Sequence, residues 1–61
     1  MSYEIQIEAS RNDKFPIRAI GVGRTRSTFE VLEVVEATDR NHAIWMIRKV
    51  CPQLKKARVT G

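Results

Sequence analysis

Alternating apolar and polar residues near the start of the chain predict β-strands. Residues 2–9 carry an apolar side chain at every second position, namely Tyr3, Ile5, Ile7 and Ala9. Such alternation is typical of a strand with one buried face. Residues 10–14 are polar and favour a turn. Residues 15–22 are rich in β-branched and aromatic side chains, and Pro16 suits a strand start or a sheet edge because proline lacks the amide donor.

Residues 29–37 have the strongest strand pattern in the chain, but the pattern is broken once. Simple alternation places one set of apolar side chains on one face, namely Phe29, Val31, Val35 and Ala37. Leu32 and Val34 would lie on the other face, and Glu33 interrupts the first set. The pattern predicts either a β-bulge near Leu32 and Glu33 or a strand that is partly covered on both faces. A covered second face would argue for a partner or a dimer.

A helix is predicted from about Arg40 to Val50. Thr38 or Asp39 can cap its first turn, and Pro52 stops it. At 100° per residue, five side chains cluster on a face that would pack on the sheet, namely Ala43, Ile44, Ile47, Val50 and Cys51. Trp45 and Lys49 lie roughly opposite this face, flanked by His42 and Arg48.

The C-terminal residues predict one more short strand. Leu54, Ala57 and Val59 interleave with Lys56, Arg58 and Thr60, which gives a cationic outer row. The expected element order is β-β-β-α-β, and residues 1–61 are expected to form one small α+β domain. Its sheet would be mostly antiparallel, with the helix packed on one face. The third and fourth strands could run parallel through a right-handed crossover.

Composition narrows the classes of protein that the chain could belong to. Of its 61 residues 43% are apolar, which suits a globular protein, and no apolar run is long enough to span a bilayer. The N-terminal residues alternate apolar and charged side chains, unlike a signal peptide or an anchor. A single cysteine, Cys51, excludes an intramolecular disulfide and is typical of a reducing compartment, so the chain is expected in the cytoplasm.

The positive charge is concentrated in the second part of the chain. Residues 1–39 contain seven acidic and five basic residues, whereas residues 40–61 contain six basic residues and no acidic one. A one-sided positive field attracts polyanions. The competing interpretation is that the excess charge serves solubility alone.

Trp45 and the cations near it are the main candidates for a binding surface. Trp45 could stack on a base or anchor a protein interface while Arg48 and Lys49 hold phosphates or carboxylates. Alternatively, the indole lies flat along the helix, or another segment or subunit covers it. Lys55, Lys56 and Arg58 would extend the basic surface, although lysines on an outer strand also prevent edge-to-edge aggregation.

The predicted loop at residues 21–28 is a second, weaker candidate. It offers two glycines, three hydroxyl groups, and the guanidinium groups of Arg24 and Arg26. Its spacing is neither that of a P-loop nor that of a dinucleotide fingerprint. The alternative, which we favour, is a hairpin connection with solvated arginines.

Catalysis and metal binding are not expected. His42 has neither a nucleophile nor an orienting partner in the sequence pattern, and Cys51 falls on the apolar helix face like a structural thiol. Three acidic residues of the third strand do not form a convincing pair, namely Glu30, Glu33 and Glu36. With one cysteine and one histidine, the chain has no metal-ligand cluster. We therefore expect no enzyme, no cofactor and no small-molecule substrate.

Two functional hypotheses follow from the sequence. The first is a non-enzymatic binding module for an acidic partner, most concretely nucleic acid or a nucleoprotein. Its contacts would come from eight residues, namely Trp45, Arg48, Lys49, Lys55, Lys56, Arg58, Arg24 and Arg26. The second is a small interaction or inhibitor protein, of the kind that phages and mobile elements encode, docking on a larger protein through the Trp45 helix face. Homodimerisation through the sheet or Trp45 is compatible with both.

Overall fold

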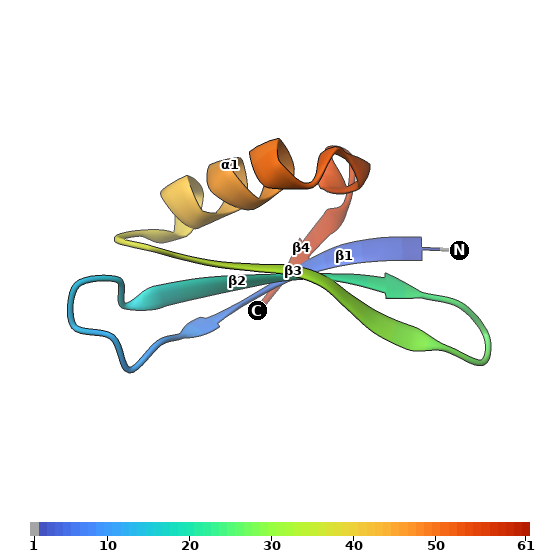
Figure 1. The fold of residues 1–61 in the computed structure, drawn as a ribbon, viewed down its shortest axis with the longest axis horizontal. Helices are drawn as coiled ribbons and strands as arrows, with labels where there is room; N and C mark the ends of the chain where they lie inside the picture. The colour runs from blue at the N-terminus through green and yellow to red at the C-terminus, as the bar shows by residue number, and fades with distance from the viewer. Residues whose placement is uncertain (1) are drawn as a thin grey trace.

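A computed structural model describes residues 2–61 and shows the expected element order (Figure 1). The strands are β1 (Ser2–Ala9), β2 (Ile17–Arg24), β3 (Phe29–Ala37) and β4 (Arg58–Thr60). One α-helix, α1 (Arg40–Val50), is followed by a single 3-10 turn, η1 (Pro52–Leu54). The prediction of an α+β domain with order β-β-β-α-β is therefore confirmed. No helix in residues 2–61 is long and apolar enough to cross a membrane.

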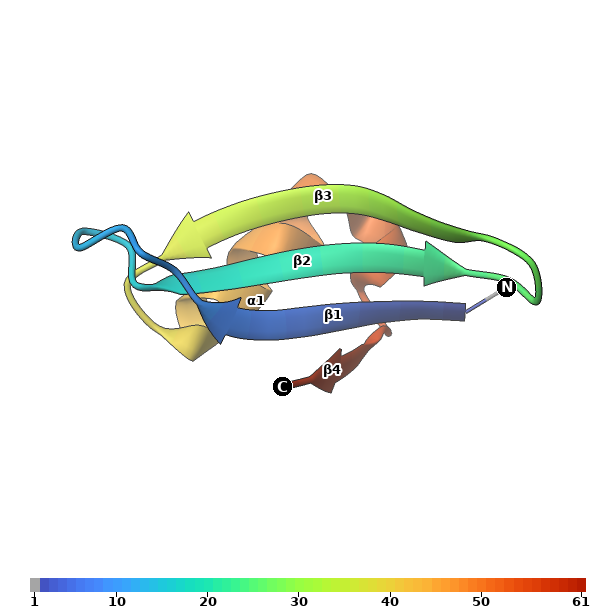
Figure 2. The same cartoon turned by 90° about the horizontal axis from the view of Figure 1, so that it is seen from below.

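The four strands form one mixed sheet in the order β3-β2-β1-β4. β2 pairs antiparallel with β1 and with β3, whereas β4 pairs parallel with β1. β3 and β4 thus run in the same direction, as expected, but they occupy opposite edges of the sheet. The helix lies over one face only, and Figure 2 shows the other face with α1 behind the strands.

A β-bulge at Leu32 breaks the alternation of β3. Gly21 pairs with Glu33 and Val22 pairs with Val31, so Leu32 has no partner on β2. This confirms the bulge and corrects the predicted face. Leu32 packs against the core with Val35. Phe29 and Val31, which simple alternation placed on the core face, are 55% and 53% exposed, because the extra residue turns the earlier part of the strand over.

Asp39 is the residue that caps the helix. Its Oδ1 atom accepts a hydrogen bond from the backbone amide of His42 at 2.7 Å. Ala43 and Ile47 are buried on the side of the helix that faces the sheet, as predicted. Val50, also predicted on the packed face, is 55% exposed. Val50 is the last residue of the helix, and it lies about 60° from Ile47 around the helix axis, at the margin of the apolar face.

Three predicted segment boundaries were wrong. β2 begins at Ile17 rather than at Phe15, since Phe15 and Pro16 lie in the connection before the strand. Residues 21–24 continue β2 and are not part of a loop. A Cβ atom on Gly21 would come within 2.2 Å of Leu54 Cδ1, so this glycine lets η1 approach the strand closely. The last strand begins only at Arg58, because Pro52 starts η1 and Leu54 is buried there. Lys55 and Lys56 therefore lie in a turn rather than on a strand.

The core is small and is built largely from alanine and aliphatic residues. Its buried members are Ile5, Ala19, Ala37, Ala43, Ile47, Leu54 and Ala57. The alanines allow the helix to lie close to the sheet, and the larger aliphatic side chains fill the space between them. Cys51 is half-buried and packs against this core, in keeping with a structural thiol. Ala9, at the end of β1, is exposed despite its alternating position.

A polar network crosses the uncovered face at one end of the sheet. Arg18 lies between Glu8, at 3.0 Å, and Glu36, at 3.5 Å. Ser10 also donates a hydrogen bond to Glu36. The Ser10 hydroxyl and the Arg18 charge lower the pKa of Glu36 below its ordinary value of 4.5. The network links all three long strands at the end that carries the β1–β2 loop.

Candidate functional site

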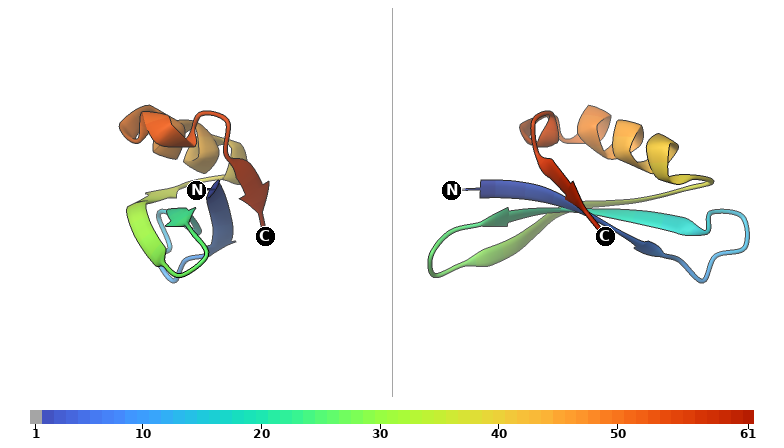
Figure 3. Two further views of the ribbon diagram at one scale, coloured as in Figure 1. Left: turned by 90° about the vertical axis from the view of Figure 1, so that its right-hand side faces the viewer. Right: turned by 180° about the vertical axis from the view of Figure 1, so that it is seen from behind.

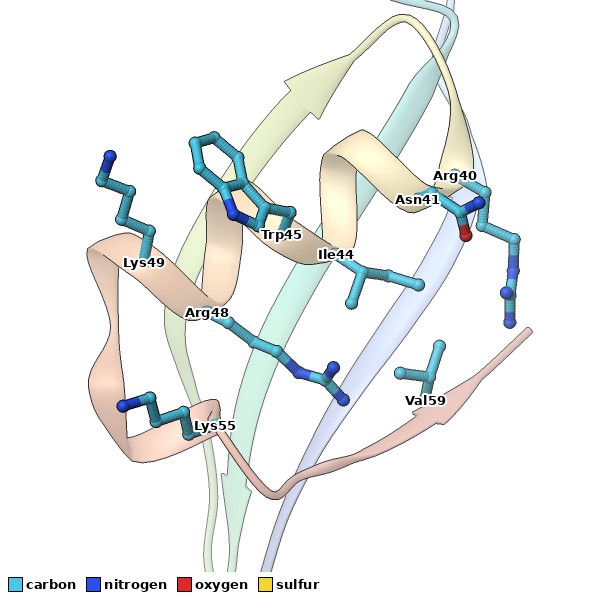
Figure 4. A pocket seen from close by; sticks show the side chains of 8 residues that line it. All are labelled: Arg40, Asn41, Ile44, Trp45, Arg48, Lys49, Lys55 and Val59. Atoms are coloured by element: carbon cyan, nitrogen blue, oxygen red, sulfur yellow. The ribbon is translucent and has the colours of Figure 1, made fainter.

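A hollow of about 800 Å³ lies between α1 and the C-terminal segment (Figure 4). We call it the helix groove, and its lining residues are Arg40, Asn41, Ile44, Trp45, Arg48, Lys49, Lys55 and Val59. It arises from the offset between layers. The helix packs mainly on β2 and β3, whereas β4 lies at the far edge beyond β1 (Figure 3).

The helix groove combines an apolar base with a cationic border. Ile44 and Val59 face each other across it from α1 and β4 in Figure 4. Four of its eight lining residues are cationic and none is acidic, so the lining carries a formal charge of +4. A concave surface with one sign of charge concentrates counter-ions and favours a polyanion.

Arg48 lies between the helix and the C-terminal segment. Its Nε atom donates to the carbonyl of Leu54 at 3.3 Å, and its Nη2 atom donates to the carbonyl of Ala57 at 3.1 Å. These bonds fasten the turn that leads into β4. Arg48 therefore has a structural role that the sequence pattern did not indicate, in addition to its charge in the groove.

Replacing Arg48 with methionine is expected to reduce the free energy of unfolding by about 1–3 kcal/mol, because two carbonyls lose charged donors. Lys49→Met is the matched control, with an expected loss below about 1 kcal/mol, since the interaction that Lys49 makes within residues 2–61 is an exposed contact with Trp45. Urea unfolding followed by circular dichroism measures both. Amide exchange should accelerate in β4 for Arg48→Met alone. Equal losses in the two variants would contradict the fastening role.

Trp45 is 58% exposed and has a neighbour on each side along the helix. The Lys49 ammonium lies 4.8 Å from the indole centroid, and the His42 ring meets the indole edge-on at a centroid distance of 5.9 Å. Figure 4 shows the indole and Lys49 on the outer side of α1, whereas Arg48 extends toward β4. The indole thus lies beside the groove, held in place by residues of its own helix.

The other predicted cations lie outside the helix groove, either around a second hollow or in the β2–β3 turn. Lys56 and Arg58 line a second hollow of about 580 Å³ together with Ser2, Tyr3, Glu4, Arg24 and Thr60. Arg24 is 2.9 Å from Glu4 in this hollow, and it also lies over the Phe29 ring at 5.3 Å. Arg26 is exposed in the β2–β3 turn. Of the eight predicted residues, the structure brings only Trp45, Arg48, Lys49 and Lys55 into the helix groove.

Arg40 and Asn41 are groove residues that sequence reasoning missed. Arg40, Ile44 and Arg48 follow one another at four-residue intervals, so they form a single row along α1. That spacing was visible in the sequence. What was not visible was the position of β4, which makes this row one wall of a groove.

The connection between β2 and β3 is a short turn, residues 25–28, closed by hydrogen bonds between its two threonines. The Thr25 amide donates to the Thr28 carbonyl at 2.9 Å, and the Thr28 amide donates to Thr25 Oγ1 at 3.1 Å. The two threonine hydroxyls also bond to each other, at 2.5 Å. Two of the three hydroxyls proposed for phosphate binding are therefore engaged within the turn, whereas Arg26 stays exposed.

Within residues 2–61, no group of three or more His, Cys, Asp or Glu side chains is placed to hold a metal ion. The Cys51 thiol contacts Gln53 Oε1 at 3.7 Å.

Comparisons with protein-family models, with curated proteins and with solved structures find no match to this chain.

Proposed function

We propose that the chain is a non-enzymatic binding module for nucleic acid, and that single strands bind in the helix groove. The observation that supports the proposal best is the groove lining, in which four cations border an apolar base without any acidic residue and an exposed indole lies beside it. Phosphates would lie against Arg40, Arg48 and Lys55. Proteins that bind single strands combine such a basic groove with an aromatic side chain on which bases stack.

The apolar base of the groove favours a flexible strand over a duplex. Ile44 and Val59 offer contact to a base or sugar that has left a base stack, whereas a duplex presents mainly phosphates to a protein surface. Trp45 lies at the groove border and can receive a base on its exposed part. Lys56 and Arg58 adjoin Lys55 along the chain, and a longer strand would reach them in the second hollow.

Fluorescence anisotropy with labelled 20-mers of single-stranded DNA, single-stranded RNA and duplex DNA tests the proposal. The double variant Arg40→Gln/Lys55→Gln should bind single strands about tenfold more weakly, and the slope of log affinity against log salt should fall by about 1.4 for two lost contacts. Neither residue has a role in the hydrogen bonds that fasten β4.

The matched control is Arg11→Gln/Lys14→Gln, which removes the same charge from the exposed β1–β2 loop. It should retain most of the affinity, because charges outside a localised binding site contribute only to the general attraction of the protein for nucleic acid. Equal losses in the two double variants would reduce the effect to net charge. Absence of binding at low salt, or affinity that does not respond to salt, would reject the proposal.

The exposure of Trp45 favours a second candidate function, an interaction protein that docks on a larger acidic protein. Its indole is held between His42 and Lys49, and a pre-positioned tryptophan is a common centre of protein interfaces. A pull-down from nuclease-treated lysate separates the candidates. A stoichiometric protein partner that is lost with Trp45→Ala would favour this function, whereas loss of all partners after nuclease would favour nucleic acid.

A further inference from the structure

The uncovered face of the sheet, which we call the outer face, has most of its exposed apolar side chains along one strand, β3. Cross-strand partners share a face, so the register assigns Val34 to the same face as Ile20, and Val31 to the same face as Val22. Val31, Val34 and Phe29 are 53%, 46% and 55% exposed. They are three of the six large apolar side chains exposed in residues 2–61, and they are consecutive on the outer row of β3.

The charges of the outer face balance, unlike those of the whole chain. Its strand positions carry three carboxylates and three guanidinium groups, namely Glu4, Glu8, Glu36, Arg18, Arg24 and Arg58. Because the chain as a whole carries +4, two copies repel each other on most approaches. An approach through the neutral outer face keeps most of the excess positive charge of both copies away from the contact and so reduces that repulsion.

The rows of the outer face are also complementary to one another. One end row, Glu8–Arg18–Glu36, has a net charge of −1, and the opposite end row, Ser2–Arg24–Phe29, has a net charge of +1. The two middle rows are Gln6–Ile20–Val34 and Glu4–Val22–Val31. They are apolar on β2 and β3 only, and Val22 is completely buried, so Val31 and Val34 are their exposed apolar members. A two-fold axis across the strands would bring each negative end row over a positive end row, and Val31 and Val34 of one copy over Val34 and Val31 of the other.

We infer that the partner of the outer face is a second copy of this chain, packed sheet to sheet about such an axis. Two-fold interfaces use the same patch on both subunits, and this patch matches itself in the net charge of its end rows and in the positions of Val31 and Val34. The molecule measures 36 × 19 × 16 Å, with the helix above the sheet along the middle dimension (Figure 1). These extents limit the footprint of the face to at most about 600 Å², below the roughly 800 Å² per partner of a standard interface, so the dimer would have a small interface.

This inference does not depend on the proposed function. In the dimer, both helices face away from the interface, because each lies on the opposite side of its own sheet (Figure 1). Two helix grooves would then be presented on opposite sides of one particle. A dimer that binds no nucleic acid, or a monomer that does, would separate the two proposals.

Sedimentation equilibrium of the 61-residue chain across a concentration series tests the dimer. The mass of the unmodified chain should rise from 7.0 kDa to twice that value. Val31→Lys places a charge near the axis in both copies and should weaken association by about 100-fold or more. Val50→Lys is the matched control, since Val50 is a valine with similar exposure on the helix, and it should dimerise normally.

A milder variant keeps the dimer testable if Val31→Lys does not fold. Val34→Thr keeps the side-chain shape and strand preference, and it should weaken the dimer by about tenfold because the change occurs twice. Circular dichroism checks that each variant is folded. A chain that remains at 7.0 kDa throughout the series overturns the inference. A dimer that survives Val31→Lys, or that is lost in the Val50→Lys control, also overturns it, because its contact would lie at the β3 edge or on the helix.

Discussion

Replacing Ile47 with alanine is expected to leave the chain largely unfolded at 37 °C. Ile47 is completely buried between the helix and the sheet. Truncation of a buried isoleucine removes about 2–5 kcal/mol through lost burial and the cavity that remains. A single core in a domain of this size rarely supplies more than about 3–5 kcal/mol. One substitution can therefore consume most of the folding free energy.

The control for this prediction is Val50→Ala on the same helix. Val50 is also β-branched but is 55% exposed, so its truncation should change the unfolding free energy by no more than about 0.5 kcal/mol. Thermal and urea unfolding, followed by far-ultraviolet circular dichroism, measure both variants. If Ile47→Ala costs no more than the control, the core as described does not hold the helix on the sheet.

Adding a single methyl group at Gly21 is expected to have a second large effect. The new Cβ of Gly21→Ala would lie 2.2 Å from Leu54 Cδ1 and 3.3 Å from Ile47 Cδ1. Both of these side chains are completely buried, so their methyl groups have little room to move aside. Overpacking of this kind typically costs about 1–3 kcal/mol, and the reduced flexibility of the unfolded chain offsets only part of it.

A double-mutant cycle tests whether the cost comes from this contact. In a Leu54→Val background the clashing Cδ1 methyl is absent while most of the buried side chain is kept, so Gly21→Ala should become nearly neutral or stabilising by filling part of the cavity. Urea unfolding of the four proteins gives the coupling energy. If Gly21→Ala costs the same in both backgrounds, its effect does not arise from η1 packing on β2.

The segments whose elements follow local rules were predictable from the sequence. The β1 strand has the predicted bounds, because strict alternation over eight residues admits one interpretation. The helix also has the predicted bounds, since Asp39 caps it and Pro52 follows it. The bulge was visible because Glu33 interrupts a row of apolar residues, although its position at Leu32 required the pairing with β2.

Where a long-range contact decides the local structure, sequence reasoning went wrong. Gly21 and Gly23 looked like loop residues, yet they belong to β2, where the absence of a side chain at Gly21 admits Leu54. Leu54 looked like a strand residue, yet the same contact buries it in η1.

The same distinction between local and long-range causes applies to the candidate site. The sequence by itself determined the chemistry available, namely an outward tryptophan on a helix and a C-terminal part without carboxylates, because charge and helical periodicity are local properties. Only the tertiary structure decided which cations act together. By pairing β4 with β1, the fold placed Arg40, Arg48, Lys49 and Lys55 around one groove with Trp45, left Lys56 and Arg58 in another hollow, and used Arg48 to hold the chain between them.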